Sequence, residues 1–136
     1  MSIKIIFILH NIYDCINGVS TKYIKFIDYI VNTQTNYNIV LFTPSDIKSD
    51  NSNLKIIKTK FITIPFYKDI KIPIFKKKIL EKELEIGNEI IIFNGEFIWI
   101  YNLLYELKIK YNRLKIYPNM HTDYVYYSSS FASNLC

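Results

Sequence analysis

The stretch IKIIFIL, residues 3–9, decides the fold, because it is a nearly continuous apolar run that stops at His10 and Asn11. Such a run is typical of a parallel strand that is covered on both faces. It is too short to span a membrane and has no cleavage site, so it is neither a transmembrane helix nor a signal peptide. We interpret it as a buried strand.

Helix and strand patterns alternate after this run. Apolar residues from Val19 to Val31 recur with a period near 3.6, which indicates one face of a helix. Further strands are expected at residues 39–42, 54–57, 61–64, 89–93 and 114–117, helices at 75–86 and 96–111, and an irregular, basic, exposed excursion at 66–73. This order predicts an α/β fold with a Rossmann-like, mostly parallel sheet and helices on both faces.

Length and composition describe one globular domain over residues 1–136. Hydrophobic residues make up 50% of the chain and charged residues 21%, which excludes a disordered protein. The two cysteines, Cys15 and Cys136, cannot form a framework of disulfides, and two histidines are too few for a structural zinc set. A reduced, cytoplasmic setting is expected.

The net charge of +5 comes from lysines that gather in residues 55–60 and 68–78. We favour a solvated face for them. The alternative is weak peripheral attraction to an anionic membrane surface, to which each basic residue adds about 1 kcal/mol. Nucleic acid is the least favoured partner, because no recognition motif is visible.

Two polar motifs follow strand-like runs and mark the candidate site. Asn17-Gly18-Val19-Ser20-Thr21 precedes the first predicted helix, and His121-Thr122-Asp123 follows the last predicted strand. In a parallel sheet, such loops meet at the carboxyl edge, where ligands bind. A glycine there lets the backbone approach a ligand, and the first helical N–H groups favour an anion; a loop glycine with positive φ is the alternative.

The remaining polar residues near strand ends have simpler interpretations. We favour a ligand contact for His121, a helix cap for Asp123, packing for His10 and a first-turn helix position for Glu96. Residues 128–130 are serines without a histidine and an acid at useful spacing, so a hydrolase triad is unsupported. The chain has no G-x-G-x-x-G and no P-loop, so nicotinamide and ATP binding lose their main support.

These motifs, taken in order, resemble a known family. Residues 3–7, the Asn17-Gly18-Val19 loop, residues 39–44 and His121-Thr122-Asp123 match the opening strand, the "NGV" loop, the "V-x-V-x-T-P"-like strand and the "yHTd" motif of that family. The chain is similar to the amino-terminal, acceptor-side half of a GT-B glycosyltransferase of the family 4 type. The similarity extends over nearly the whole chain, and residues 45–86 add nothing to it.

The resemblance implies retaining transfer of a sugar from a nucleotide-sugar donor to a hydroxyl acceptor, either a lipid or a glycan. Gly18, with Asn17 and Val19, would line the donor side. His121 would be the catalytic contact to the transferred sugar, and Thr122 and Asp123 would bind substrate. Catalysis would rest on positioning and on charge stabilisation of the leaving diphosphate, without a bound metal or a further cofactor.

The resemblance also implies a carboxyl-terminal domain, which carries an "E-x7-E" element and the basic residues that grip the donor diphosphate. We expect that domain to be absent from these 136 residues, so that the chain alone binds a nucleotide sugar poorly and catalyses little. Either a longer protein, from which these residues would be cut, or a separate partner chain would complete the enzyme. The sequence leaves enzymatic activity open, since a non-catalytic Rossmann-like interaction module or a decayed remnant is the alternative. A hydrolase or epimerase acting on nucleotide sugars is disfavoured, because the cofactor fingerprint is missing.

Overall fold

The computed structural model of the protein describes residues 3–15, 18–33, 36–65, 67–84, 89–95, 98–111 and 113–118. Strands and helices follow one another in the described chain as β1 (Ile3–Ile8), α1 (Gly18–Thr33), β2 (Tyr37–Thr43), β3 (Leu54–Lys58), β4 (Lys60–Ile64), β5 (Tyr67–Ile74), α2 (Lys77–Leu84), β6 (Glu89–Asn94), α3 (Ile98–Lys110) and β7 (Lys115–Pro118). This order confirms the predicted α/β class.

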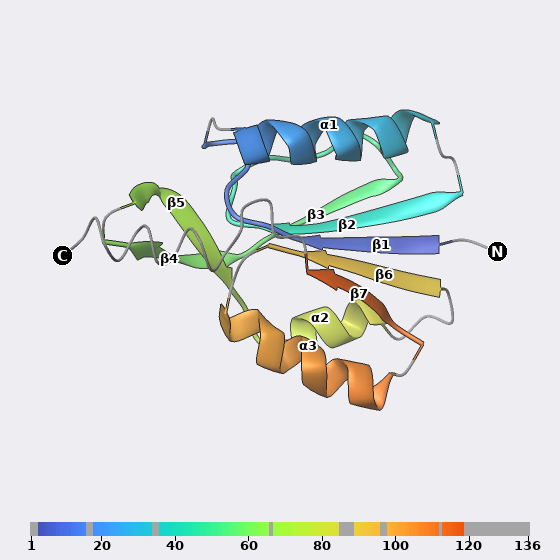
Figure 1. Ribbon diagram of the computed structural model, residues 1–136. Coiled ribbons are helices and arrows are strands. Elements are labelled where there is room, and N and C mark those ends of the chain that lie inside the picture. The colour runs from blue at the N-terminus through green and yellow to red at the C-terminus, as the bar shows by residue number, and fades with distance from the viewer. Residues whose placement is uncertain are drawn as a thin grey trace.

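Five strands form one parallel sheet in the order β3-β2-β1-β6-β7. The central strand is β1, in which Ile5 pairs with Ile39 of β2 on one side and with Ile91 of β6 on the other. One face of the sheet carries α1, and the opposite face carries α2 and α3 (Figure 1). The predicted Rossmann-like sheet with helices on both faces is therefore confirmed.

The apolar run of β1 contributes side chains to two separate cores, because successive side chains of a strand point to opposite faces. Ile5 and Phe7 pack with the buried residues of α1, whereas Ile6 and Ile8 pack with those of α2 and α3. Full burial of one such side chain contributes about 1.5–3 kcal/mol. A strand buried on both faces must be apolar at consecutive positions, which explains why the run lacks polar alternation.

The predicted stripe of α1 is buried as expected over its centre. Tyr23, Ile27 and Ile30 are buried against the sheet. Phe26 lies at the edge of the stripe and is 44% exposed, but its ring packs 5.9 Å from that of Phe7, between centroids. The helix therefore covers its face of the sheet with one continuous apolar stripe.

The prediction of an irregular excursion is wrong for residues 67–73, which belong to β5. This strand pairs antiparallel with β4, with Ile62 opposite Ile72, and the two form a separate ribbon beyond the main sheet (Figure 1). Residues 69–74 of this strand show no regular alternation of buried and exposed side chains, and Ile62 of β4 is 50% exposed. Backbone pairing with β4 makes it a strand, and a burial pattern does not reveal that pairing.

The carboxyl ends of the five parallel strands lie together at one edge of the sheet, which we call the carboxyl edge. The first turn of α1 and the β4–β5 ribbon both lie at this edge (Figure 1). Residues that are far apart in sequence therefore meet there. This is the edge at which parallel α/β proteins bind their ligands.

Candidate functional site

Buried polar side chains are concentrated at the carboxyl edge. Of the nine buried polar or charged residues in the described ranges, two, Lys4 and Glu83, form an ion pair away from this edge. The other seven, which we call the edge cluster, lie at or just after strand ends or in the first turn of α1: His10, Asn11, Ser20, Thr43, Ser45, Thr59 and Asn94. Burying polar groups costs free energy unless they are hydrogen-bonded. Their concentration here marks the edge as the candidate site.

The centre of the edge cluster is a contact between β1 and α1. Nε2 of His10 lies 2.9 Å from Oγ of Ser20, and both residues are buried. Either the hydroxyl donates to an unprotonated Nε2, or the Nε2–H donates to the hydroxyl oxygen. Thr43, at the end of β2, donates its hydroxyl to the backbone oxygen of His10 over 2.7 Å. These bonds hold the ends of three elements together. His10 is therefore packed, as predicted, and it is also hydrogen-bonded.

Asn11 attaches the β4–β5 ribbon to the end of β1. Its Nδ2 donates to the backbone oxygen of Asp69 over 2.9 Å, and its Oδ1 accepts from the backbone N–H of Lys71 over 2.8 Å. The side-chain amide thus donates one hydrogen bond to the backbone of β5 and accepts one from it, as the backbone of a paired strand does. The ribbon is held across one side of the candidate site.

Asn94 supplies an acceptor at the end of β6. The residue is fully buried, and its Nδ2 donates to the backbone oxygen of Gly95 over 3.1 Å. Its Oδ1 has no hydrogen-bond partner within the part of the chain that the structure describes. A buried acceptor left unpaired costs about 1–3 kcal/mol, which a ligand donor would recover.

The backbone of Gly18 is accessible at the start of α1. The residue is exposed, and no described residue, glycine included, has a positive φ. Apart from the two chain neighbours and the backbone of its own helix, no atom lies within 4 Å of an added Cβ, so neither the backbone conformation nor packing requires glycine here. The alternative of a loop glycine with positive φ does not hold. Val19 is half-buried and packs against the α1-side core.

The N-terminus of α1 favours an anion. Its first turn carries no acidic side chain, and the aligned peptide dipoles of a helix give its start a partial positive charge. Nearby, the backbone N–H of Tyr13 donates to Oγ of Ser45 over 3.2 Å. Burial, with a smaller contribution from Asp28, raises the pKa of the Tyr13 phenol above its ordinary value. This phenol therefore stays protonated and can donate a hydrogen bond.

Several predicted site residues lie outside the described residues: Asn17, Glu96, His121, Thr122 and Asp123, with residues 128–130 and Cys136. The described chain does reach the carboxyl edge at Pro118, whose backbone is in register with Asn94 of β6. Position 118 precedes His121 by three residues. The strand before the His121 motif is therefore parallel, and it ends at the predicted edge.

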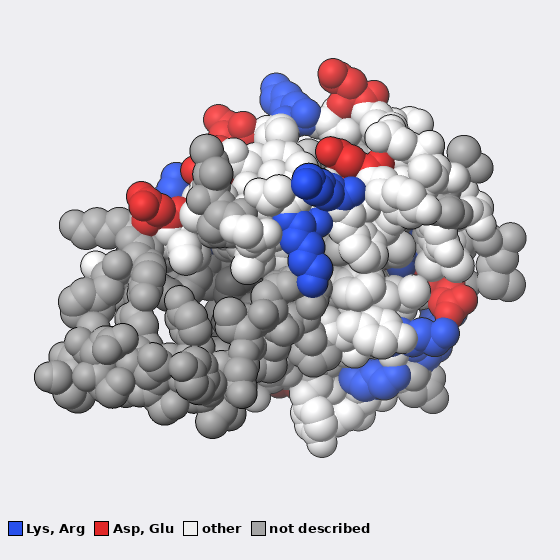
Figure 2. All heavy atoms as spheres, turned by 45° about the horizontal axis from the view of Figure 1, so that its top comes forward, with Lys and Arg blue, Asp and Glu red and all other residues white. Residues whose placement is uncertain are grey.

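Charge on the α1 face has no single sign. Acidic and basic side chains are interspersed there, with uncharged surface between them (Figure 2). None of the described helices is long and apolar enough to cross a membrane. Within the described ranges, no group of three or more His, Cys, Asp or Glu side chains is placed to hold a metal ion.

The sequence interpretation gave no site role to Asn11 or Asn94, and it named Ser20 only as part of the motif Asn17-Gly18-Val19-Ser20-Thr21. Asn11 and Asn94 had a usable signal, since each is a polar residue at the end of an apolar run. Nothing in the sequence predicted the contact between Ser20 and His10, because that contact depends on how α1 packs on the sheet. Comparison with protein-family models, with curated proteins and with solved structures finds no match to this chain.

Proposed function

We propose that this chain is the acceptor-side domain of a glycosyltransferase that uses a nucleotide-sugar donor. Support comes from the parallel sheet, the edge cluster at its carboxyl edge, and the sequence resemblance to the family 4 type. The acceptor would be a hydroxyl of a lipid or a glycan. A carboxyl-terminal domain or a partner chain would complete the enzyme.

The observation that carries the proposal is the accessible backbone of Gly18. A diphosphate needs N–H donors and an approach without side chains, and the first turn of a helix offers both when it starts with glycine. Here the glycine is exposed, the space that a Cβ would occupy is open to 4 Å, and no carboxylate of the first turn repels an anion. The donor diphosphate would lie on this turn.

The edge cluster supplies the polar contacts that a sugar would use. The unpaired Oδ1 of Asn94 would accept from a sugar hydroxyl, and the His10–Ser20 contact would hold the first turn of α1 in position. His121, Thr122 and Asp123 stay proposed contacts to the transferred sugar and acceptor, with His121 as the catalytic residue. The domain would contribute positioning and charge stabilisation of the leaving diphosphate.

Titration of the isotope-labelled chain with UDP-glucose and GDP-mannose, followed by NMR, tests this function. We expect weak binding, with shift changes centred on Gly18, His10 and Asn94, and weaker effects from UMP, which lacks the diphosphate. Gly18→Val should abolish these changes because its side chain occupies the approach. Asn32→Val, at the exposed far end of α1, is the matched control and should keep them.

The result that would contradict the function is equally specific. Shift changes elsewhere on the chain, or an unaltered titration in Gly18→Val, would remove the donor diphosphate from this turn. In the completed enzyme, Gly18→Val should abolish transfer while the fold is kept. His121→Ala should cost much of kcat, and a wild-type rate would exclude His121 from catalysis.

One observation favours the alternative of a non-catalytic interaction module. Tyr101, Tyr105 and Ile109 are spaced by four residues on α3 and are 36%, 70% and 69% exposed. A stripe of this kind on a helix suits a protein partner. Sedimentation velocity across a concentration series tests it: association that is lost in Tyr105→Lys would favour the module, and a monomer throughout would not.

A further inference from the structure

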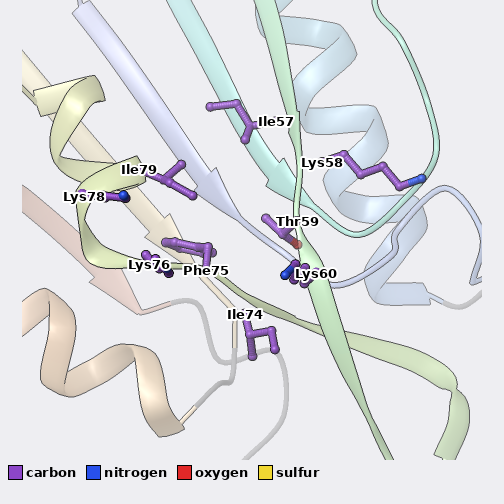
Figure 3. A pocket seen from close by; sticks show the side chains of 9 residues that line it. All are labelled: Ile57, Lys58, Thr59, Lys60, Ile74, Phe75, Lys76, Lys78 and Ile79. Atoms are coloured by element: carbon purple, nitrogen blue, oxygen red, sulfur yellow. The ribbon is translucent and has the colours of Figure 1, made fainter.

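The two lysine-rich segments of the sequence converge on one pocket. Its volume is about 620 Å³, and it lies where the end of β3 and the start of β4 meet the end of β5 and the start of α2 (Figure 3). The segment 57–60 forms one side and the segment 74–79 the other. Because α2 covers the face opposite α1, this pocket is distinct from the turn at Gly18 (Figure 1).

Three of the lysines in the pocket have no acidic partner among the described residues. Lys58 pairs with Asp46, at 3.4 Å between Nζ and Oδ1, and extends away from the other lysines (Figure 3). Lys60, Lys76 and Lys78 line the pocket but take part in none of the ion pairs of the described chain. Three uncompensated ammonium groups around one cavity attract an anion of more than one charge.

The rest of the lining is apolar and well supported. Ile57, Ile74, Phe75 and Ile79 line the pocket, and Ile57, Phe75 and Ile79 pack against the α2-side core. The ring of Phe75 stacks on Phe42 at 4.9 Å and meets Trp99 edge-on at 5.4 Å, between centroids. An apolar lining that is held in place by the core suits the hydrocarbon part of a ligand better than it suits a free inorganic ion.

A buried hydroxyl completes the lining. Thr59 is 7% exposed, and its backbone N–H donates to the backbone oxygen of Thr43 over 3.0 Å. Thr59 lines the pocket, and its Oγ1 has no hydrogen-bond partner in the described chain. Since an unpaired buried hydroxyl costs about 1–3 kcal/mol, a ligand oxygen that accepts from it would recover that free energy.

We propose that this pocket binds a phosphorylated amphiphile. Lys60, Lys76 and Lys78 would neutralise the phosphate group, the Thr59 hydroxyl would donate to one of its oxygens, and the hydrocarbon would lie on Phe75 and the isoleucines. Lysine binds phosphate as a point charge, so several lysines around one pocket suit a small, doubly charged group. The proposal does not depend on sugar transfer at Gly18.

Calorimetric titration of the full chain with octyl phosphate, inorganic phosphate and octanol tests the proposal. We expect octyl phosphate to bind at least about tenfold more tightly than either inorganic phosphate or octanol. Lys60→Gln and Lys76→Gln should each weaken it by about fivefold to tenfold, and added salt should weaken it further. Lys25→Gln, an exposed site on α1, removes the same charge and should leave the affinity unchanged.

Thr59→Val separates binding from folding, because valine keeps the shape and removes the hydroxyl. The Thr59→Val variant should unfold at the same denaturant concentration as the unchanged protein or at a higher one, and it should bind octyl phosphate more weakly. Three outcomes would each overturn the proposal. The chain could bind octyl phosphate and inorganic phosphate with equal affinity, or Lys60→Gln and Lys25→Gln could lose the same affinity for octyl phosphate. The third is that Thr59→Val keeps its full affinity for octyl phosphate. Binding to phosphatidylglycerol vesicles without binding to monomeric octyl phosphate would also overturn it, and would assign the lysines to a membrane surface.

Discussion

Nε2 of His10 and Oγ of Ser20 lie 2.9 Å apart, although the first follows β1 and the second belongs to the first turn of α1. This contact connects the end of the central strand to the helix start that carries Gly18. It therefore positions the proposed diphosphate turn relative to the sheet. Its consequences can be measured without knowing the substrate.

Ser20→Ala should lower the free energy of unfolding by about 1 kcal/mol, because it deletes a hydrogen bond between buried groups. Urea denaturation followed by circular dichroism measures the change. Thr33→Ala is the matched control, since the hydroxyl of Thr33 donates to the backbone of Tyr29 on the exposed end of the same helix. An equal cost in the two variants would show that the His10–Ser20 bond adds nothing beyond a surface contact.

Gly18→Ala should leave stability unchanged or raise it by up to about 1 kcal/mol, because alanine restricts the unfolded chain and favours the helix. The space for its methyl group is open, and φ is not positive. Thermal unfolding measures the effect. A clear loss of stability would mean that glycine is needed by the fold itself, and the case for a ligand at this turn would weaken.

Asn11→Ala should release the β4–β5 ribbon, because both bonds from its side chain to β5 are lost. We expect a cost of about 1–3 kcal/mol and faster hydrogen exchange of the Lys71 amide. Asn11→Asp keeps the acceptor for Lys71 and loses the donor to Asp69. In this variant the Lys71 amide should exchange faster than in the unchanged chain and more slowly than in Asn11→Ala. Unchanged exchange in Asn11→Ala would show that the ribbon holds its place without this side chain.

Glu83 should make the protein sensitive to acid. Burial alone would raise the pKa of its carboxyl, but the hydrogen bond and charge of Lys55, with those of Lys4, outweigh burial and hold this pKa below its ordinary value of 4.5. A carboxyl whose pKa is lowered by folding stabilises the native state above its unfolded pKa. That contribution is lost as pH falls through the folded pKa.

Glu83→Gln should therefore cost most at neutral pH, about 3 kcal/mol, and progressively less below the ordinary carboxyl pKa. The large value follows from Lys4, whose buried ammonium lies 3.3 Å from the Glu83 carboxylate and would lose its charge partner. Adding Lys4→Met should recover much of the loss. Lys55→Gln should cost less, since the Lys55 side chain is 63% exposed. A cost of Glu83→Gln that does not vary with pH would contradict this account.

The sequence predicted the sheet well because β1 and β2, at its centre, are buried on both faces. Residues 5–9 and 39–42 are apolar at consecutive positions, and burial on two faces requires that pattern. The same reasoning failed for residues 67–73, since the ribbon strand β5 gains its order from backbone pairing with β4. Backbone hydrogen bonds between two strands do not require a particular pattern of side chains, so the sequence does not reveal them.

The candidate site was likewise predicted in part from the sequence, and the rest of it depends on the tertiary structure. Apolar periodicity alone determined the α/β class, the first helix and the edge where polar residues follow strands. Only the tertiary structure placed Ser20 opposite His10 and turned Asn11 toward β5. It also brought Lys58 and Lys60 together with Lys76 and Lys78 around one pocket. Periodicity records which face of an element is buried, whereas a contact between elements depends on how those faces pack together.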